Sequence, residues 1–134
     1  MNLAPGHLRA AYRSGALKPS DVARHVLSRL SDPDQSGVWI STARPDGVMA
    51  AARALDARLG EIDTLPLYGL IFSVKDCIDV AGEQTTSACP EFAYAARDSS
   101  PVVADAIAAG AIYVGKTNMD QFATGLVGVR SPYG

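Results

Sequence analysis

The sequence is poor in the residues that metal sites and disulfide frameworks need. Its 134 residues include only two cysteines, Cys77 and Cys89, and two histidines, His7 and His25. Two thiols cannot make a disulfide framework, and with two distant histidines they do not form a metal-ligand set. The histidines lie in or beside predicted helices, without a third ligand-type neighbour. We therefore expect no metal site and two buried or half-buried thiols.

Long apolar runs and clusters of positive charge are also missing. Twelve Lys and Arg residues stand against fourteen Asp and Glu, for a net charge of -2. Without a basic cluster to neutralise phosphates, nucleic acid is not an expected partner. No segment is long enough to span a bilayer, and no apolar run follows Arg9 and Arg13, so we expect no membrane partner and a cytoplasmic location. A hydrophobic content of 48% with 19% charged residues indicates a globular chain, either one domain or part of a larger one.

The first part of the chain, residues 1–64, is predicted to be helical. Apolar residues at helical spacing predict helices over His7–Ser14, Asp21–Leu30 and Gly47–Leu59. Ser20 is the expected cap of the second helix, and Gly60 ends the third. Residues 38–40 form only a brief apolar patch. None of these elements carries a recognisable chemical group for catalysis.

Residues 65–134 have a different pattern, which predicts strand, loop, helix, strand and loop. A short apolar run, Leu70–Val74, is typical of a buried strand and leads directly into Lys75. A helix starts at Pro101, with Ser99 or Ser100 as its cap, and ends at Gly110. The second strand, 111–114, follows. Such a connection predicts two parallel strands in one sheet covered by helices, and therefore an α/β fold.

The two loops of this second part lie where a ligand would bind. In open α/β sheets ligands bind outside the carboxyl ends of the strands, and both Lys75 and Lys116 are expected at that edge. The loop 77–98 is long for a compact domain, as functional loops often are. The segment 117–134 carries several glycines, among them Gly125 and Gly128. These glycines either form turns or allow a ligand to come close to the backbone.

Common catalytic motifs are absent. No Gly-x-Gly-x-x-Gly follows a predicted strand, Gly115-Lys116-Thr117 lacks the upstream glycine loop of a phosphate site, and no Gly-x-Ser-x-Gly elbow occurs. What remains is Lys75 beside a hydroxyl-rich loop. A lysine acts as a base only where burial or a nearby positive charge lowers its pKa from about 10.4. Judged by spacing alone, Lys75 is more simply a surface lysine or an ion-pair partner of Asp76 or Asp79.

Two segments resemble a known family, in the same order along the chain. Residues 66–76 read PLYGLIFSVKD and residues 109–120 read AGAIYVGKTNMD, which are similar to two motifs of the amidase signature enzymes. Residues 88–94, ACPEFAY, and 120–134, DQFATGLVGVRSPYG, look like the allophanate hydrolase branch of that family. The resemblance is strong from about Leu65 onward and only general before it. It implies a partial amidase-signature fold, in which the sheet is mixed, mainly parallel, and has helices on both faces.

The resemblance implies an amide C–N bond hydrolase with a Ser–cis-Ser–Lys triad, in which Lys75 matches the lysine. The lysine takes a proton through one serine, which activates the serine that attacks the amide carbonyl. At the end of a buried strand, desolvation would favour the uncharged amine of Lys75. Thr124 and Gly125 match positions near the substrate, and no cofactor is implied. In the allophanate hydrolase branch the substrate is the small amide allophanate, an intermediate of urea degradation, and the products are ammonium and carbon dioxide.

The resemblance also implies that this chain is the truncated amino-terminal part, 1–134, of an amidase domain. In the family both serines follow a pair like Tyr133-Gly134, so we expect the chain alone to be inactive. Cys77 stands where the family commonly has asparagine. Exposed strand edges predict self-association, or pairing with the missing part of the domain. Two other interpretations stay open: a noncatalytic binding module derived from an amidase, and an amidase, or the A subunit of an amidotransferase, with another specificity.

Overall fold

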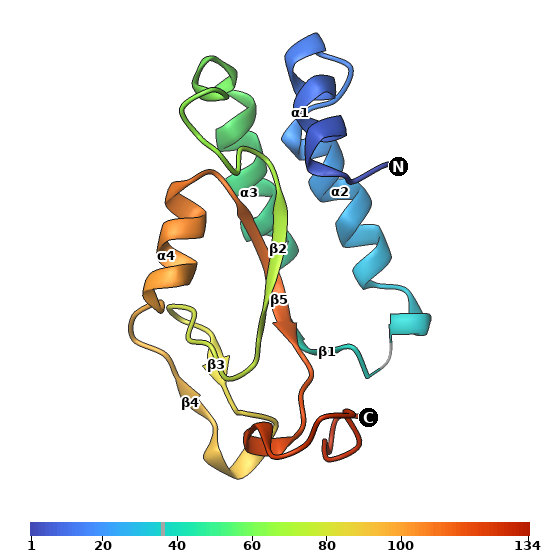
Figure 1. The fold of residues 1–134 in the computed structure, drawn as a ribbon, viewed down its shortest axis with the longest axis vertical. Helices are drawn as coiled ribbons and strands as arrows, with labels where there is room; N and C mark the ends of the chain where they lie inside the picture. Colours follow the sequence, from blue (N-terminus) through green and yellow to red (C-terminus); the bar gives the residue numbers. More distant parts are fainter. Residues whose placement is uncertain (36) are drawn as a thin grey trace. The chain divides into compact units, whose positions relative to one another are not determined.

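The computed structural model describes residues 1–35 and 37–134 (Figure 1), and these residues form two compact units. The first unit consists of Met1–Asp32, Ala43–Phe72 and Ala106–Val114. The second consists of Pro33–Thr42, Ser73–Asp105 and Gly115–Gly134. The chain passes between the two units several times.

The first unit contains the predicted amino-terminal helices, which are α1 (Pro5–Ser14), α2 (Pro19–Leu30) and α3 (Pro45–Asp56). Each begins at a proline, whose missing N–H costs nothing in the first helical turn. The expected cap is wrong: Ser20 lies inside α2, where its backbone N–H donates to Asp56 Oδ1 at 3.0 Å. Lys18 is the residue at the cap position, and its N–H donates to the Asp21 carboxylate at 3.0 Å.

The core of the first unit is built around two buried tyrosines. The ring centroids of Tyr12 and Tyr68 lie 5.7 Å apart in an edge-to-face arrangement. The Tyr12 hydroxyl donates to the Gly69 carbonyl at 3.0 Å, and the Tyr68 hydroxyl donates to the Leu55 carbonyl at 2.6 Å. Burial raises the pKa of both phenols above its ordinary value. Helices α1 and α3 and the segment before β2 are therefore tied together by buried polar contacts.

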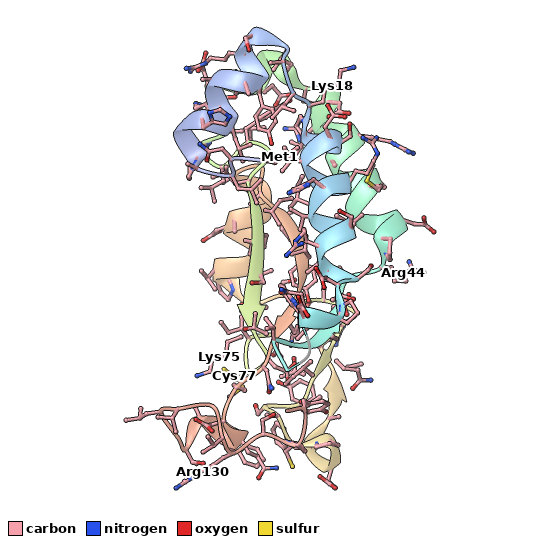
Figure 2. All side chains as sticks on the ribbon, turned by 90° about the vertical axis from the view of Figure 1, so that its right-hand side faces the viewer. Met1, Lys18, Arg44, Lys75, Cys77 and Arg130 are labelled. Carbon is pink, nitrogen blue, oxygen red and sulfur yellow. The ribbon has the colours of Figure 1, made fainter. Side chains whose placement is uncertain are left out.

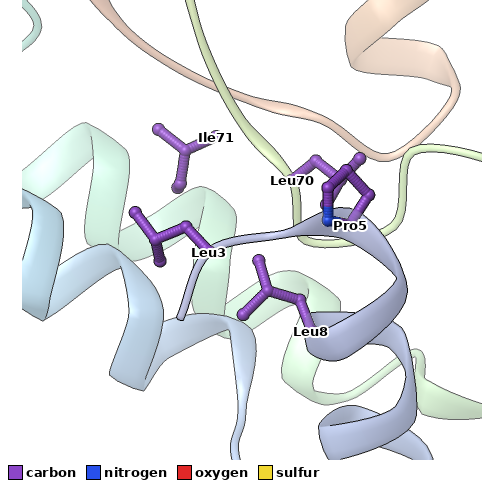
Figure 3. Close-up of a pocket in the computed structure, with 5 residues that line it drawn as sticks. All are labelled: Leu3, Pro5, Leu8, Leu70 and Ile71. Atoms are coloured by element: carbon purple, nitrogen blue, oxygen red, sulfur yellow. The ribbon is translucent and has the colours of Figure 1, made fainter. Parts of the chain in front are cut away.

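A small hollow in the first unit is lined by apolar side chains (Figure 3). Its lining residues are Leu3, Pro5, Leu8, Leu70 and Ile71. None of them offers a charged or hydrogen-bonding side chain, which binding sites use to orient a ligand. The hollow is therefore a packing feature next to the start of β2.

Three strands form one mixed sheet in the order β1 (Trp39–Thr42), β5 (Ile112–Thr117), β2 (Ile71–Lys75). The predicted parallel pair is confirmed, because the Ile112 N–H donates to the Leu70 carbonyl and, further along, the Asp76 N–H donates to the Thr117 carbonyl. The apolar patch at 38–40 overlaps β1, a strand that the sequence pattern does not predict. This strand pairs antiparallel with β5, with Thr42 opposite Gly115. An apolar run this short becomes a strand only when a partner strand accepts its hydrogen bonds.

The remaining elements follow the sequence pattern closely. Helix α4 (Pro101–Ala108) begins at the expected proline, and Gly110, with φ 93°, ends the turn after it. The loop 77–98 contains a two-stranded ribbon of β3 (Gln84–Thr85) and β4 (Tyr94–Ala95), which the sequence pattern does not predict. Short 3-10 turns occur at Pro33–Gln35, Leu59–Glu61, Pro90–Phe92 and Gln121–Ala123. Within the described ranges no helix has the length and apolar character to cross a membrane.

Candidate functional site

Lys75 and Lys116 lie in the second unit at the carboxyl ends of the neighbouring strands β2 and β5, but their surroundings differ completely. Lys75 is exposed, whereas the side chain of Lys116 is 0% exposed. The expectation that the Lys75 amine is desolvated at the end of a buried strand is therefore wrong for this chain. Side chains alternate along a strand, so Val74 points inward while Ser73 and Lys75 face solvent. Figure 2 labels Lys75 beside Cys77, which is also exposed and not buried as expected.

Asp76, the residue after Lys75, is fully buried and pairs with the other lysine. Its Oδ1 lies 3.6 Å from Lys116 Nζ, and both side chains are inaccessible to solvent. Its Oδ2 accepts hydrogen bonds from the Thr86 N–H at 3.0 Å, from the Thr86 hydroxyl, and from the Ala88 N–H at 3.4 Å. The ion-pair partner of Asp76 is thus Lys116 and not Lys75. A buried charge is tolerated only with such partners.

Lys116 is linked to a second carboxylate through a threonine. Its Nζ donates to Thr85 Oγ1 at 2.7 Å and to the Asp76 carbonyl at 3.4 Å. The Thr85 hydroxyl in turn donates to Asp79 Oδ1 at 2.7 Å, and the Tyr94 hydroxyl donates to the same oxygen at 2.8 Å. These hydrogen bonds from Thr85 and Tyr94, followed by the charge of Lys116, lower the pKa of Asp79. We call Lys116, Asp76, Asp79, Thr85 and Thr86 the Lys116 cluster.

Sequence reasoning placed Lys116 at the sheet edge but missed the cluster. Two signals could have pointed to it: a lysine at the end of an apolar strand, and adjacent threonines in the loop 77–98. Neither signal identifies Asp76 as the partner, because the two residues are 40 positions apart. Only the pairing of β2 with β5 brings them together.

Two strained turns lie beside the buried carboxylate. Ser87 and Ala88 have φ values of 50° and 57°, and Phe122 and Ala123 have 51° and 56°. Residues with a side chain rarely adopt this left-handed region, and such strain persists where surrounding contacts enforce it. The Phe122 N–H donates to the Ser87 carbonyl at 2.9 Å, so one strained turn holds the other. The Ala88 N–H, from the first turn, reaches Asp76.

Thr124 and Gly125, the expected substrate contacts, are held within their own loop. The Thr124 hydroxyl donates to the Gln121 carbonyl at 2.8 Å. A Cβ atom on Gly125 would lie 2.5 Å from the Asp120 carboxylate. That carboxylate accepts the N–H groups of Arg130 and Gly128, which lower its pKa. Among the residues described, no hydrogen bond joins Thr124 or Gly125 to Lys75. The close approach at Gly125 is therefore to Asp120.

Metal binding finds no support in the part of the chain that the structure describes. No group of three or more His, Cys, Asp or Glu side chains could hold an ion there. Asp76 and Asp79 are occupied by Lys116, the two threonines and Tyr94. The chemistry available at this edge of the sheet is an exposed primary amine backed by a buried ion pair.

Comparison with known protein families and structures identifies the class of this fold. A family model described as Amidase matches residues 21–134, and the chain therefore belongs to the Amidase family. Urea amidolyase from Saccharomyces cerevisiae is 54% identical over 119 residues, 86% of this chain and 6% of that protein. The A subunit of glutamyl-tRNA(Gln) amidotransferase from Symbiobacterium thermophilum is 34% identical over 135 aligned positions, 98% of this chain and 28% of that protein.

Solved structures agree with this assignment. The allophanate hydrolase of Kluyveromyces lactis superimposes with a TM-score of 0.77 at 37% identity, over 94% of this chain and 21% of that chain. The expected α/β fold of the amidase signature type is thus confirmed. The chain spans a small part of the relatives it matches, between 6% and 28% of their lengths in these three comparisons.

Proposed function

We propose that this chain forms part of an amide-bond hydrolase whose substrate is allophanate, cleaved to ammonium and carbon dioxide. The observation that carries the proposal is the similarity to urea amidolyase, at 54% identity, together with the fold match to an allophanate hydrolase. Hydrolysis of allophanate, an intermediate of urea degradation, would need no metal or organic cofactor.

Lys75 is the residue that we assign to the chemistry. It is the last residue of β2, in the segment PLYGLIFSVKD, and its side chain is exposed, so groups from another part of the protein can reach it. In this proposal Lys75 accepts a proton through one serine, and that serine activates a second serine that attacks the amide carbon. Both serines and the oxyanion donors would come from outside residues 1–134, which form the amino-terminal part of the amidase domain. The chain alone would then have almost nothing to lower the barrier to acyl transfer.

An exposed apolar surface of the second unit supports pairing with further protein. Phe92 contacts both Tyr94 and Phe122 edge to face, with centroid distances of 5.7 and 5.3 Å, and all three rings are exposed. The loop after Phe122 adds Leu126, Val127 and Val129, which are 101%, 77% and 78% exposed. The three rings in mutual contact form an exposed apolar patch, which is typical of an interface. We assign it to contact with the rest of the amidase domain.

The A subunit of an amidotransferase with another specificity is the second candidate, favoured by the 34% identity that extends over 98% of the chain. The two candidates differ in substrate, so allophanate and glutamine serve as competing test compounds. If no protein that contains this segment turns over allophanate or glutamine, the remaining interpretation is a noncatalytic binding module.

The experiment compares the isolated chain with a longer protein that carries it. The isolated chain should release no ammonia from allophanate or malonamide above the blank, and a fluorophosphonate probe should not label it. In the longer protein, Lys75→Met should abolish ammonia release, whereas Lys18→Met, at an exposed lysine of the first unit, should leave it unchanged. Turnover by the repurified isolated chain, or full activity of Lys75→Met, would refute the proposal.

A further inference from the structure

A buried carboxylate directly follows the lysine to which we assign the chemistry. Asp76 is 0% exposed, whereas Lys75, the last residue of β2, is exposed. Because Asp76 is the next residue along the chain, an unpaired negative charge there would favour the protonated form of a neighbouring amine. A lysine that has to accept a proton would therefore be impaired by an uncompensated Asp76.

Lys116 is placed to cancel that charge. Its ammonium lies 3.6 Å from Asp76 Oδ1 and donates to the carbonyl oxygen of the same residue. The backbone of Asp76 is also fixed, because its N–H donates to the Thr117 carbonyl at 3.2 Å. Thr117 of β5 thus holds the backbone of Asp76, and its neighbour Lys116 holds the Asp76 carboxylate.

The other charged and titratable groups of the cluster are tied to each other rather than to Lys75. Asp79 accepts hydrogen bonds from Thr85 and Tyr94, and Thr85 connects it to Lys116. Thr86 and Ala88 donate to the oxygen of Asp76 that does not face Lys116. Cys77, the other titratable neighbour of Asp76 along the chain, is exposed. The ion pair of Asp76 with Lys116 therefore involves the residue that directly follows Lys75.

We propose that Lys116 is a positioning residue for Lys75: it neutralises Asp76, so that this carboxylate does not hold a proton on the Lys75 amine, and it fixes the backbone from which Lys75 projects. The inference gives a role to the proposed catalytic lysine and in that respect rests on the proposed function. Its electrostatic part can be measured on the isolated chain, whether or not the chain belongs to an active hydrolase.

The experiment measures how fast each lysine reacts with acetic anhydride between pH 7 and 10, because only the neutral amine is acylated. The chain has three lysines, which peptide mass spectrometry can follow separately. Lys75 and Lys18 are exposed, and Lys116 is buried and should react slowly. Lys18, in the first unit, is the internal control for reagent, pH and overall charge.

Two substitutions should shift the Lys75 rate in opposite directions. Lys116→Met leaves Asp76 uncompensated and should lower the rate at a fixed pH by about threefold, the size of a weak interaction between unit charges in a largely solvated setting. Asp76→Asn leaves Lys116 uncompensated and should raise the rate by a similar factor. The double variant Asp76→Asn/Lys116→Met carries no charge at the pair and should return to within twofold of the wild-type rate. Lys18 should be unaffected in all of them.

Shifts in the same direction for both single variants would mean that the substitutions merely loosen the structure, and would overturn the proposal. Unchanged Lys75 rates in variants with native circular dichroism would also overturn it. A single variant can fail to fold because a buried charge has lost its partner. In that case the double variant decides: a Lys75 rate that differs more than threefold from the wild-type rate contradicts charge cancellation. Loss of activity in Lys75→Met of a longer protein tests the proposed function separately.

Discussion

Replacing Gly115 by alanine should destabilise the chain, because β1 passes directly over this residue. A Cβ atom at Gly115 would lie 2.6 Å from the Ser41 carbonyl oxygen and 3.0 Å from Thr42 Cα, and both are backbone atoms of β1. Non-bonded carbon atoms pack at about 3.5–4.0 Å, so β1 would have to move by about 0.5–1 Å. Overpacking of this kind costs about 1–3 kcal/mol. For a chain of this size we expect the Tm to fall by about 5–10 °C.

Gly47→Ala is the matched control, since the chemical change is the same and the surroundings are open. Gly47 lies in the first turn of α3, and nothing comes within 4 Å of the point where its Cβ atom would lie. Alanine should stabilise the chain there by about 0.4–1 kcal/mol, because it restricts the unfolded chain. Thermal unfolding followed by circular dichroism gives both Tm values. Acylation of Lys116, which follows Gly115 and is buried, should also become faster in Gly115→Ala. Equal Tm changes for the two variants, or an unchanged Gly115→Ala protein, would refute the packing argument.

Other contacts lead to three further predictions. Gly125→Val should displace the Asp120 carboxylate and speed amide hydrogen exchange at Gly128 and Arg130; unchanged exchange would return Gly125 to the role of a ligand contact. Because the pKa of folded Asp79 lies below the unfolded value of 3.8, its stabilising effect is present above that value and is lost as the pH falls through the folded pKa. Asp79→Asn should therefore lower the Tm at pH 6 and have little effect at the acid end of a titration, and a pH-independent difference would contradict this. The exposed rings and the loop after Phe122 should bind ANS, and the chain should self-associate in size-exclusion chromatography. A monomer that unfolds cooperatively and gives no ANS signal would contradict this.

The sequence by itself determines the local elements of this protein. Helices α1 to α4 appear close to where apolar spacing predicts them, and α4 begins at the proline expected for it, although α3 ends at Asp56 and not at Gly60. The parallel pairing of β2 with β5 follows from the order of strand, helix and strand. These features depend on neighbours within a few residues, or on the general handedness of such connections. The family motifs, read as a resemblance, also identify the fold correctly.

The tertiary structure decides which of these residues are paired and which are exposed. The segment at Trp39 becomes a strand only because β5 offers it hydrogen bonds, and β5 extends to Thr117 alongside it. Lys75 and Lys116 have similar positions at the ends of strands, yet one is exposed and the other is fully buried against Asp76. The physical reason is that the burial of a charge depends on partners that lie far away in the sequence. For Lys116 that partner is 40 residues earlier, and only the register of β2 on β5 brings the two together.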